Sequence, residues 1–247
     1  MIKFFRKIRQ NLLKEGKTAR YFKYAIGEII LVVIGILIAL QINNWNLQRI
    51  EQHKENIYLA NIKRDLHNQL SIINIQLEYE QKYLDNSQPI LDYYYKHNKI
   101  ILDARFIQNL STLTERKTFV SNDTTYTDLI STGNIDIIKD IKFKNKLIEY
   151  YQDLERFEII IQNNNIYLND QIYVSGVINL LYLNDSNEPL SIELIEVSNQ
   201  ILEKEENVLL LINLVNHRKD LAKGHFSIMH ESKSKTQQLL NFMDSKP

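Results

Sequence analysis

The chain has 247 residues, with 30 Lys and Arg against 30 Asp and Glu, so its formal net charge is zero. It contains no cysteine, which excludes a disulfide framework, a thiol nucleophile and a cysteine-ligated metal site. Only six glycines and three prolines interrupt a chain long enough to bury a core, a composition that fits long helices and that a biased genome would also produce.

The first predicted element is a transmembrane helix over 24–45. The stretch 25–42 is almost wholly apolar. Between Tyr24 and Trp45 an α-helix rises about 31 Å, close to the thickness of a bilayer's hydrocarbon core. Aromatic residues stand at both ends of the stretch, as is typical of the membrane–water interface. We therefore expect this segment to contact the lipid bilayer instead of lying inside a soluble domain.

The charges around this helix predict its orientation. Eight basic residues and one acidic residue precede it, so the positive-inside rule predicts a cytoplasmic tail over 1–23 and an exported, periplasmic domain over 46–247. The apolar run is long for a signal peptide and no small-x-small cleavage pattern follows, which favours an uncleaved signal anchor in a bacterial inner membrane. The exported part is mildly acidic, so we expect no nucleic-acid partner. The basic tail could touch anionic lipid head groups or serve only as a topology signal.

After the membrane span, apolar residues recur at three- and four-residue steps as far as Leu84. This periodicity predicts that the transmembrane helix continues without a break for roughly 40 residues. The polar segment 86–89 is expected to end it, with Ser87 capping the next helix and Pro89 in that helix's first turn. We expect the second helix over 90–115, with a polar middle at 97–103 that allows a break.

Capping and stop signals organise the remainder of the chain. Capping residues at 122–125 predict a short helix over 126–131, ended by Gly133 in a left-handed conformation. Asp140 is expected to cap a longer helix over 141–183, and 184–189 has the composition of a loop. The segment 191–243 is expected to form one long helix or two.

No segment shows the sustained two-residue alternation of a β-strand. The sequence therefore predicts an all-α fold: one N-terminal transmembrane helix followed by an antiparallel bundle of four or five long helices. No repeat or low-complexity linker divides the exported part, so one exported domain is the simplest organisation.

Three residues of the predicted span are candidates for specific contacts. Glu28 is a carboxylate within the membrane, where ionisable groups are costly and are functional candidates by default. It could reach back to a basic residue of the tail, contact another membrane subunit, or carry protons. Gly35 and Ala39 form a small-xxx-small pair that would allow a second helix to approach closely, as in a homo-oligomer.

The sequence predicts no catalytic, cofactor-binding or metal-binding residue. His217, His225 and His230 are eight and five residues apart, whereas two zinc ligands on one helix are typically four apart. There is no Gly-x-Ser-x-Gly turn, glycine-rich nucleotide loop or serine–lysine signature. We therefore expect no cofactor and no enzymatic activity.

Two blocks of sequence carry a family resemblance. The first has MIKFFR at 1–6, YAIGEI at 24–29 and GILIALQINNW at 35–45; the second has YTDLISTGN at 126–134 and KLIEYY at 146–151. They resemble a large family of single-pass membrane proteins from Gram-negative bacteria that is catalogued only as a domain of unknown function. The resemblance covers most of the chain. It implies an N-terminal anchor and an exported helical domain, and it draws attention to Glu28 and to Gly133-Asn134, although a helix stop alone would explain that pair.

Three functions are compatible with this reading. The leading hypothesis is a non-enzymatic inner-membrane protein whose periplasmic bundle binds or positions another envelope component, with a membrane or periplasmic protein as partner. The second is an accessory subunit of an ion-driven or transport machine that uses Glu28, an analogy of architecture only. The third is a periplasmic helical sensor, which would act through a partner because the predicted cytoplasmic tail is too short for a signalling domain.

Overall fold

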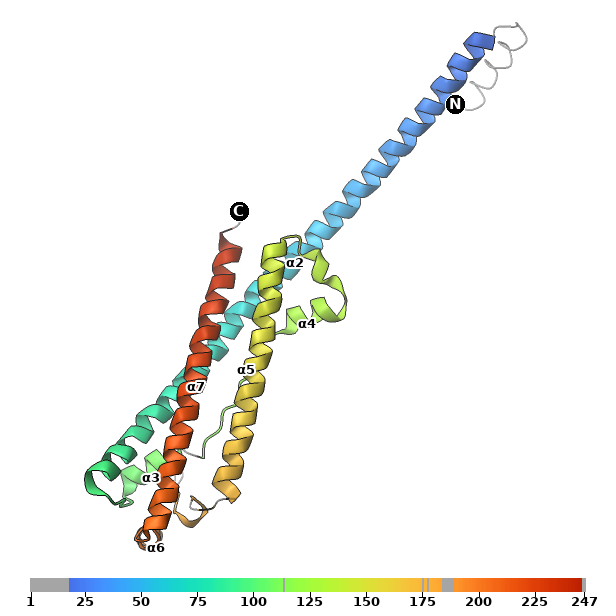
Figure 1. Cartoon of the computed structure of the whole chain (residues 1–247). Helices are drawn as coiled ribbons and strands as arrows, with labels where there is room; N and C mark the ends of the chain where they lie inside the picture. The colour runs from blue at the N-terminus through green and yellow to red at the C-terminus, as the bar shows by residue number, and fades with distance from the viewer. Residues whose placement is uncertain (1–17, 113, 175, 177, 184–188, 246–247) are drawn as a thin grey trace. The chain divides into compact units, whose positions relative to one another are not determined.

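The computed structural model describes residues 18–112, 114–174, 176, 178–183 and 189–245. The chain divides into two units, unit 1 at residues 1–57 and unit 2 at residues 58–247. In the described residues the secondary structure is entirely helical (Figure 1). The elements are α2 (Thr18–His97), α3 (Ala104–Ser111), α4 (Thr124–Ser131), the 3₁₀ turn η1 (Asn134–Ile137), α5 (Ile141–Val174), the 3₁₀ turn η2 (Ile178–Leu180), α6 (Ile192–Ile201) and α7 (Glu205–Asp244).

The all-α prediction is confirmed in its class, but the predicted number of long helices is not. Among the described residues, α2, α5 and α7 have 80, 34 and 40 residues, whereas α3, α4 and α6 have only 8 to 10. Most of the predicted tail 1–23 lies outside the described residues. The two units meet at 57/58, and the predicted end of the membrane span at 45/46 stays a prediction.

Helix α2 confirms that the helix of the apolar stretch continues into the polar part of the sequence, but its predicted end at 86–89 is wrong. The helix passes through Pro89 and ends at His97. Ser87 donates its hydroxyl to the carbonyl of Leu84, 3.0 Å away, and so does not cap a new helix. Ile90 and Leu91 are both buried, and their packing outweighs the one helical hydrogen bond that a proline cannot make.

The other predicted boundaries hold in part. The polar break after His97 is confirmed, although the helix that follows ends at Ser111 instead of 115. Helix α5 begins as predicted, since the Asp140 carboxylate accepts from the backbone N–H of Phe143 at 2.9 Å, but it ends at Val174, before Gly176 with its positive φ of 84°. The C-terminal region forms two helices, α6 and α7. Residues 184–188 of the predicted loop lie outside the described residues.

The long helices of unit 2 are not all antiparallel. Helix α7 is antiparallel to α2, since Lys63 pairs with Asp244 whereas Tyr83 reaches Val215. It is also antiparallel to α5, in which Tyr150 bonds Thr236 while Asn164 bonds His225. The portion of α2 in unit 2 and α5 therefore point the same way, as the colours of the two ribbons in Figure 1 confirm.

Two parallel helices need a return connection, and the non-helical segment 115–123 provides it. At one end the carbonyl of Glu115 accepts from the Tyr79 hydroxyl at 2.7 Å. At the other end the backbone N–H of Asn122 donates to the Gln69 carboxamide at 2.6 Å. The ten residues from 69 to 79 of α2 rise about 15 Å, a distance that seven extended residues cover easily at roughly 3.3 Å each.

The core of unit 2 consists of two apolar clusters. One gathers side chains from the C-terminal part of α2, α3, the end of α5, α6 and the first half of α7. The other gathers side chains from the earlier part of α2, α4, α5 and the second half of α7. Between Leu77 and Tyr83 on α2, where one cluster gives way to the other, the buried side chain is the carboxylate of Glu80.

Candidate functional site

A long run of exposed apolar side chains lies in unit 1. From Ala25 onward α2 is long and apolar enough to cross a membrane, and none of its most apolar 18-residue window is buried. Large side chains such as Ile29, Leu37 and Trp45 are more than half exposed. A soluble helix would cover such a face with other parts of the chain. This segment is therefore a candidate membrane anchor by length and composition.

The three residues singled out in this segment lie on one open helix. Glu28 is half-buried, while Gly35 and Ala39 are exposed. A Cβ added to Gly35 would meet no atom within 4 Å, so space for a second helix exists on that face. The structure brings these residues together with none of the residues singled out in unit 2, because it describes the two units separately.

The conspicuous turn at Gly133-Asn134 has a structural role. Gly133 has a positive φ of 69° and donates its N–H to the carbonyl of Ile130 at 3.1 Å, which ends α4 as predicted. Asn134 starts η1 and donates its side-chain amide to the Thr132 hydroxyl at 2.8 Å. Both residues serve the chain reversal between α4 and α5.

Helix α4 is fastened to α2 by a buried carboxylate that sequence reasoning did not single out. Asp65 is buried on α2 and accepts from both the backbone N–H and the hydroxyl of Thr125 in the first turn of α4. The side chain of Asn122 donates to the Asp65 carbonyl at 3.0 Å. A side chain from a neighbouring helix thus caps α4, because its oxygen accepts from an N–H group that has no partner within the first turn.

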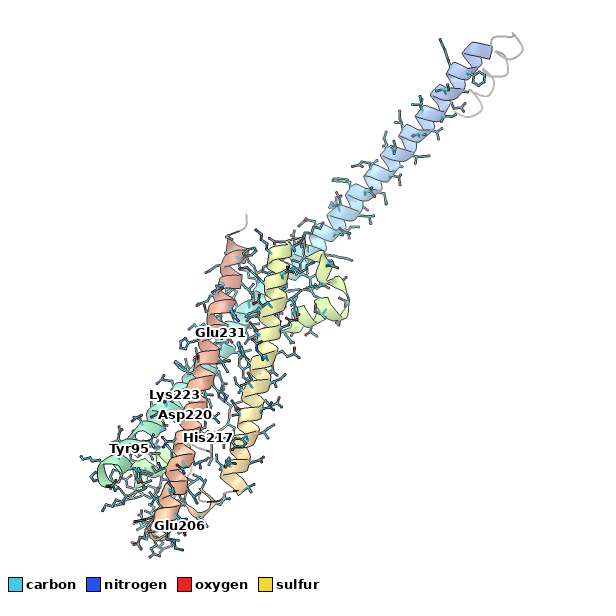
Figure 2. All side chains as sticks on the ribbon, viewed as in Figure 1. Tyr95, Glu206, His217, Asp220, Lys223 and Glu231 are labelled. Carbon is cyan, nitrogen blue, oxygen red and sulfur yellow. The ribbon has the colours of Figure 1, made fainter. Side chains whose placement is uncertain are left out.

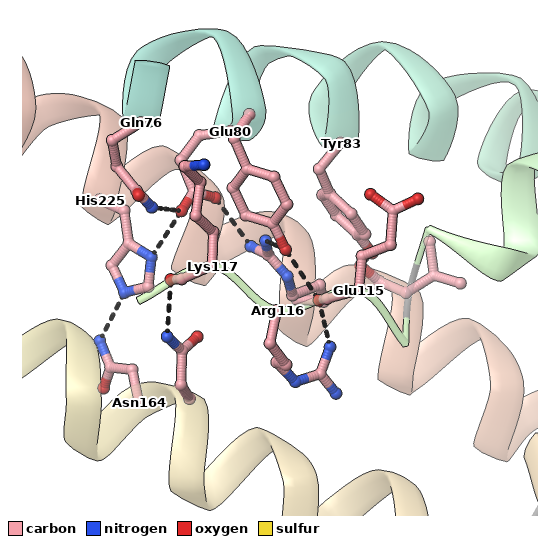
Figure 3. Close-up of polar contacts among 12 residues, drawn as sticks. Gln76, Glu80, Tyr83, Glu115, Arg116, Lys117, Asn164 and His225 are labelled. Carbon is pink, nitrogen blue, oxygen red and sulfur yellow. Dashed lines mark hydrogen bonds and ion pairs between the residues drawn. The ribbon is translucent and has the colours of Figure 1, made fainter. Parts of the chain in front are cut away.

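A second buried cluster, which we call the Glu80 cluster, joins α2 to α7 (Figure 3). Glu80 accepts from Arg218 Nη1 at 3.0 Å on one oxygen and lies 3.0 Å from His225 Nδ1 on the other. Gln76 donates to that second oxygen at 2.9 Å. Glu80, Arg218 and His225 are only 1–2% exposed, so all three are removed from water.

An outer ring of contacts completes the Glu80 cluster. The side-chain amide of Asn164 on α5 lies 3.0 Å from His225 Nε2, which fits the tautomer that carries its proton on Nδ1 and donates to Glu80. Arg218 stacks over the ring of Tyr83, with 4.2 Å between guanidinium and ring centroid, and reaches the Tyr79 hydroxyl at 3.4 Å. The cluster thereby ties all three long helices together.

The pKa shifts in this cluster have opposing causes. Burial raises the pKa of Glu80, but the hydrogen bond from His225 and the attraction of Arg218 together outweigh it, so the pKa of Glu80 lies below its ordinary value. Burial lowers the pKa of Arg218, but Glu80, Tyr79 and Tyr83 together outweigh it and the net shift is upward. Burial dominates at Tyr79 and Tyr83, and it raises the pKa of both hydroxyls. Glu80 and Arg218 therefore remain a charged pair inside the protein.

The Glu80 cluster has the composition of an acid–base site but not its accessibility. A catalytic carboxylate or imidazole must come within hydrogen-bond reach of a substrate. Here the carboxylate oxygens and both ring nitrogens already have partners within the protein. The sequence did carry one signal for it, since Arg218 and His225 interrupt the apolar stripe of α7 seven residues apart.

A groove in unit 2 is open to solvent where α2 ends and α7 begins. It encloses about 1030 Å³ and its floor includes the buried side chains of Ile100, Leu202 and Val208. The Asn199 side chain fixes this floor by pairing with both the N–H and the carbonyl of Leu102, at 2.7 and 3.2 Å. The groove is further lined by Tyr94, Asn98, Lys99, Ile101, Glu203, Glu205, Glu206 and Leu209.

The groove offers both apolar and acidic surface. Ile101 and Leu209 are about half exposed on its wall. Three carboxylates, Glu203, Glu205 and Glu206, face one lysine, Lys99, and Figure 2 labels Glu206 at the start of α7. Sequence reasoning missed this site because its two walls lie about one hundred residues apart in the chain.

The three histidines considered as metal ligands are held in separate contacts. His225 belongs to the Glu80 cluster, His217 packs edge-on against Tyr167, and His230 packs edge-on against Phe226. In the part of the chain that the structure describes, no three His, Asp or Glu side chains are grouped as metal ligands.

Comparison with known proteins identifies a family but no characterised relative. A family model described as a family of unknown function (DUF6090) matches residues 28–178, more than half of the chain. The match begins at Glu28 and includes Gly133-Asn134, the rest of α2, and α3, α4 and α5. No curated protein and no solved structure matches the chain.

Proposed function

The chain belongs to the DUF6090 family of unknown function, and we propose that it is a non-enzymatic, single-pass inner-membrane protein whose helical unit 2 binds or positions another envelope component. The single observation that carries the anchoring is the apolar helix in unit 1, which none of the described residues of that unit covers. The eight basic residues that precede it support a cytoplasmic N-terminus and a periplasmic unit 2.

The groove between the end of α2 and the start of α7 is the proposed binding surface. Apolar side chains such as Ile101 and Leu209 favour a partner with apolar residues, and the surplus of carboxylates over Lys99 favours basic residues among them. The occupant that fits best is a polypeptide segment that carries both, presented by another envelope protein.

The non-enzymatic part of the proposal is supported by the state of the buried charges. Arg218 and His225 are both bonded to Glu80, and all three side chains are only 1–2% exposed, so none of them is presented to a substrate at the surface. Their arrangement fits a structural role in joining α2 to α7.

The proposed interaction can be tested by crosslinked capture of the tagged full-length protein from native membranes, with partners identified by mass spectrometry. We expect a stoichiometric protein partner that is lost in the double variant Glu203→Gln/Glu206→Gln. The matched control is Glu193→Gln/Glu196→Gln, which removes two exposed carboxylates of α6 that do not line the groove. If the partner is lost equally in both variants, or is retained in both, the groove is not the binding surface.

A parallel arm with Glu28→Gln distinguishes the alternative role of the membrane helix. A membrane partner that persists in the groove variant but disappears in Glu28→Gln would favour an accessory subunit of a membrane machine. Anchoring itself is tested by alkaline extraction of membranes. Orientation is tested with Lys223→Cys, because the chain has no native cysteine to react with a membrane-impermeant maleimide.

A further inference from the structure

Within unit 1, the apolar side chains of helix α2 follow a regular spacing. Apolar side chains recur with alternating steps of three and four residues, the 3.5-residue period of a left-handed coiled coil. Asn43 and Lys54 are the only polar members of the series. Its ten positions, alternately a and d of a heptad, are Ile26, Ile29, Val33, Ile36, Leu40, Asn43, Leu47, Ile50, Lys54 and Ile57.

The informative part of this series lies beyond Trp45. Inside the apolar stretch nearly every position is apolar, so any register would fit. Between residues 46 and 57, by contrast, the only apolar side chains are Leu47, Ile50 and Ile57, and all three fall on the a/d series. The pattern therefore continues where lipid no longer explains an apolar surface.

Among the described residues of unit 1, nothing covers this seam. Leu47, Ile50 and Ile57 are 49, 46 and 48% exposed. Isolated exposed apolar residues are ordinary, but here they form one line along a helix whose other side chains in the same turns are polar. A line with a 3.5-residue period fits one kind of cover, a second helix that crosses at a small angle.

We infer that this second helix is α2 of another copy of the chain, in a parallel two-stranded coiled coil from the membrane span to Ile57. The inference rests on the proposed membrane anchoring. Copies with one topology in one membrane hold their helices parallel, with identical residues at identical depth. Each seam residue then faces the same residue of the other copy. Asn43 faces the Asn43 amide of that copy, which offers both a donor and an acceptor.

The polar layers are consistent with a defined pairing. A polar residue at an a position of a coiled coil lowers stability but specifies the register and the oligomeric state. Lys54 provides such a layer at an a position, and Asn43 adds a polar layer at a d position. Gly35 and Ala39 fall at the c and g positions of the heptad, outside the seam, so this interface differs from the small-residue contact that the sequence first suggested.

The absence of native cysteine makes a direct test possible. Leu47→Cys, Ile50→Cys and Ile57→Cys are introduced singly into the full-length protein and oxidised in native membranes. The matched controls are Gln48→Cys and Asn56→Cys, which lie next to seam positions but on other faces of the helix. A disulfide requires Cβ atoms about 4 Å apart, so we expect at least about fivefold more crosslinked dimer from the seam variants than from the controls.

Two differently tagged copies are co-expressed, and the crosslinked product must carry both tags. Gly35→Cys and Ala39→Cys are oxidised in the same way to probe the small-residue face. Equal crosslinking at seam and control positions overturns the proposal, as does no crosslinking, a product with only one tag, or more dimer from Gly35→Cys and Ala39→Cys than from the seam variants. Fractionation of the same samples shows whether the protein is in the membrane, and so distinguishes failure of the inferred pairing from failure of the proposed anchoring. Protein that stays in membranes without seam crosslinks is anchored but does not pair as inferred.

Discussion

Glu80→Gln tests the buried charge cluster most directly, because the change keeps the shape of the side chain and removes only its charge. In the native protein, the carboxylate accepts from Arg218 at 3.0 Å, His225 at 3.0 Å and Gln76 at 2.9 Å. In the variant, the new amide nitrogen is a donor and must face one of these donors. Arg218, 2% exposed, loses its counter-ion within the interior.

Removing one partner of a buried ion pair typically costs about 3–5 kcal/mol, because the remaining charge stays desolvated. In a protein of this size, each kcal/mol corresponds to roughly 2–4 °C in melting temperature, so we expect a loss of about 6–20 °C. The assay is thermal unfolding of the full-length protein in detergent, followed by circular dichroism at 222 nm.

The exposed pair formed by Asp220 and Lys223 provides the control. Its atoms are 3.6 Å apart and both side chains are more than half exposed, so Asp220→Asn is expected to cost about 0–1 kcal/mol. The variant Glu80→Gln/Arg218→Met removes both buried charges and should recover much of the loss. If Glu80→Gln costs no more than Asp220→Asn, or if the two buried substitutions are additive, the reasoning about this cluster is wrong.

The same cluster predicts a pH dependence whose sign follows from the shift. The folded protein holds the pKa of Glu80 below its value in the unfolded chain, about 4.5. Its contribution to stability is therefore fully present above that unfolded pKa and is lost as the pH falls through the folded pKa. We expect native protein to lose more stability between neutral pH and pH 3 than Glu80→Gln does; identical acid profiles would contradict the assignment.

Three further substitutions test individual contacts by the same unfolding assay. Gly133→Ala places a Cβ on a residue with φ of 69° and should cost about 1–2 kcal/mol, whereas Gly133→Asn should cost less; equal losses would count against a left-handed stop. Asp65→Asn weakens the hydrogen bonds to Thr125 and should cost about 1–2 kcal/mol. The same change made in a Thr125→Ala background should cost much less if the two residues act as a pair. Tyr150→Phe removes the 2.7 Å hydrogen bond to Thr236 and should cost about 1 kcal/mol, so an unchanged melting temperature would mean that this bond adds nothing net.

Local signals in the sequence predicted the local features of this fold well. The left-handed turn at Gly133, the cap at Asp140 and the helix break after His97 each depend on a few adjacent residues, and each is confirmed. The passage of α2 through Pro89 was missed because packing of Ile90 and Leu91, which involves distant parts of the chain, outweighs the local preference.

The features that the sequence did not predict depend on distant residues. Nothing near Glu80 indicates that Arg218, 138 residues later, supplies its counter-ion. The parallel direction of α2 and α5 follows from the extended segment 115–123, which has no periodic pattern of its own. The groove likewise needs the ends of two helices to meet, so only three-dimensional placement reveals it.

The long reach of the Glu80 cluster has a consequence for how the protein is made. His225 lies 145 residues after Glu80, and α7 comes last in chain order among the helices of unit 2. When the chain is synthesised or exported from its N-terminus, Glu80 therefore lacks Arg218 and His225 until almost the whole chain has emerged. A chain truncated before α7 would hold a carboxylate with neither Arg218 nor His225 to meet it, and such fragments should be recognised as unfolded and degraded.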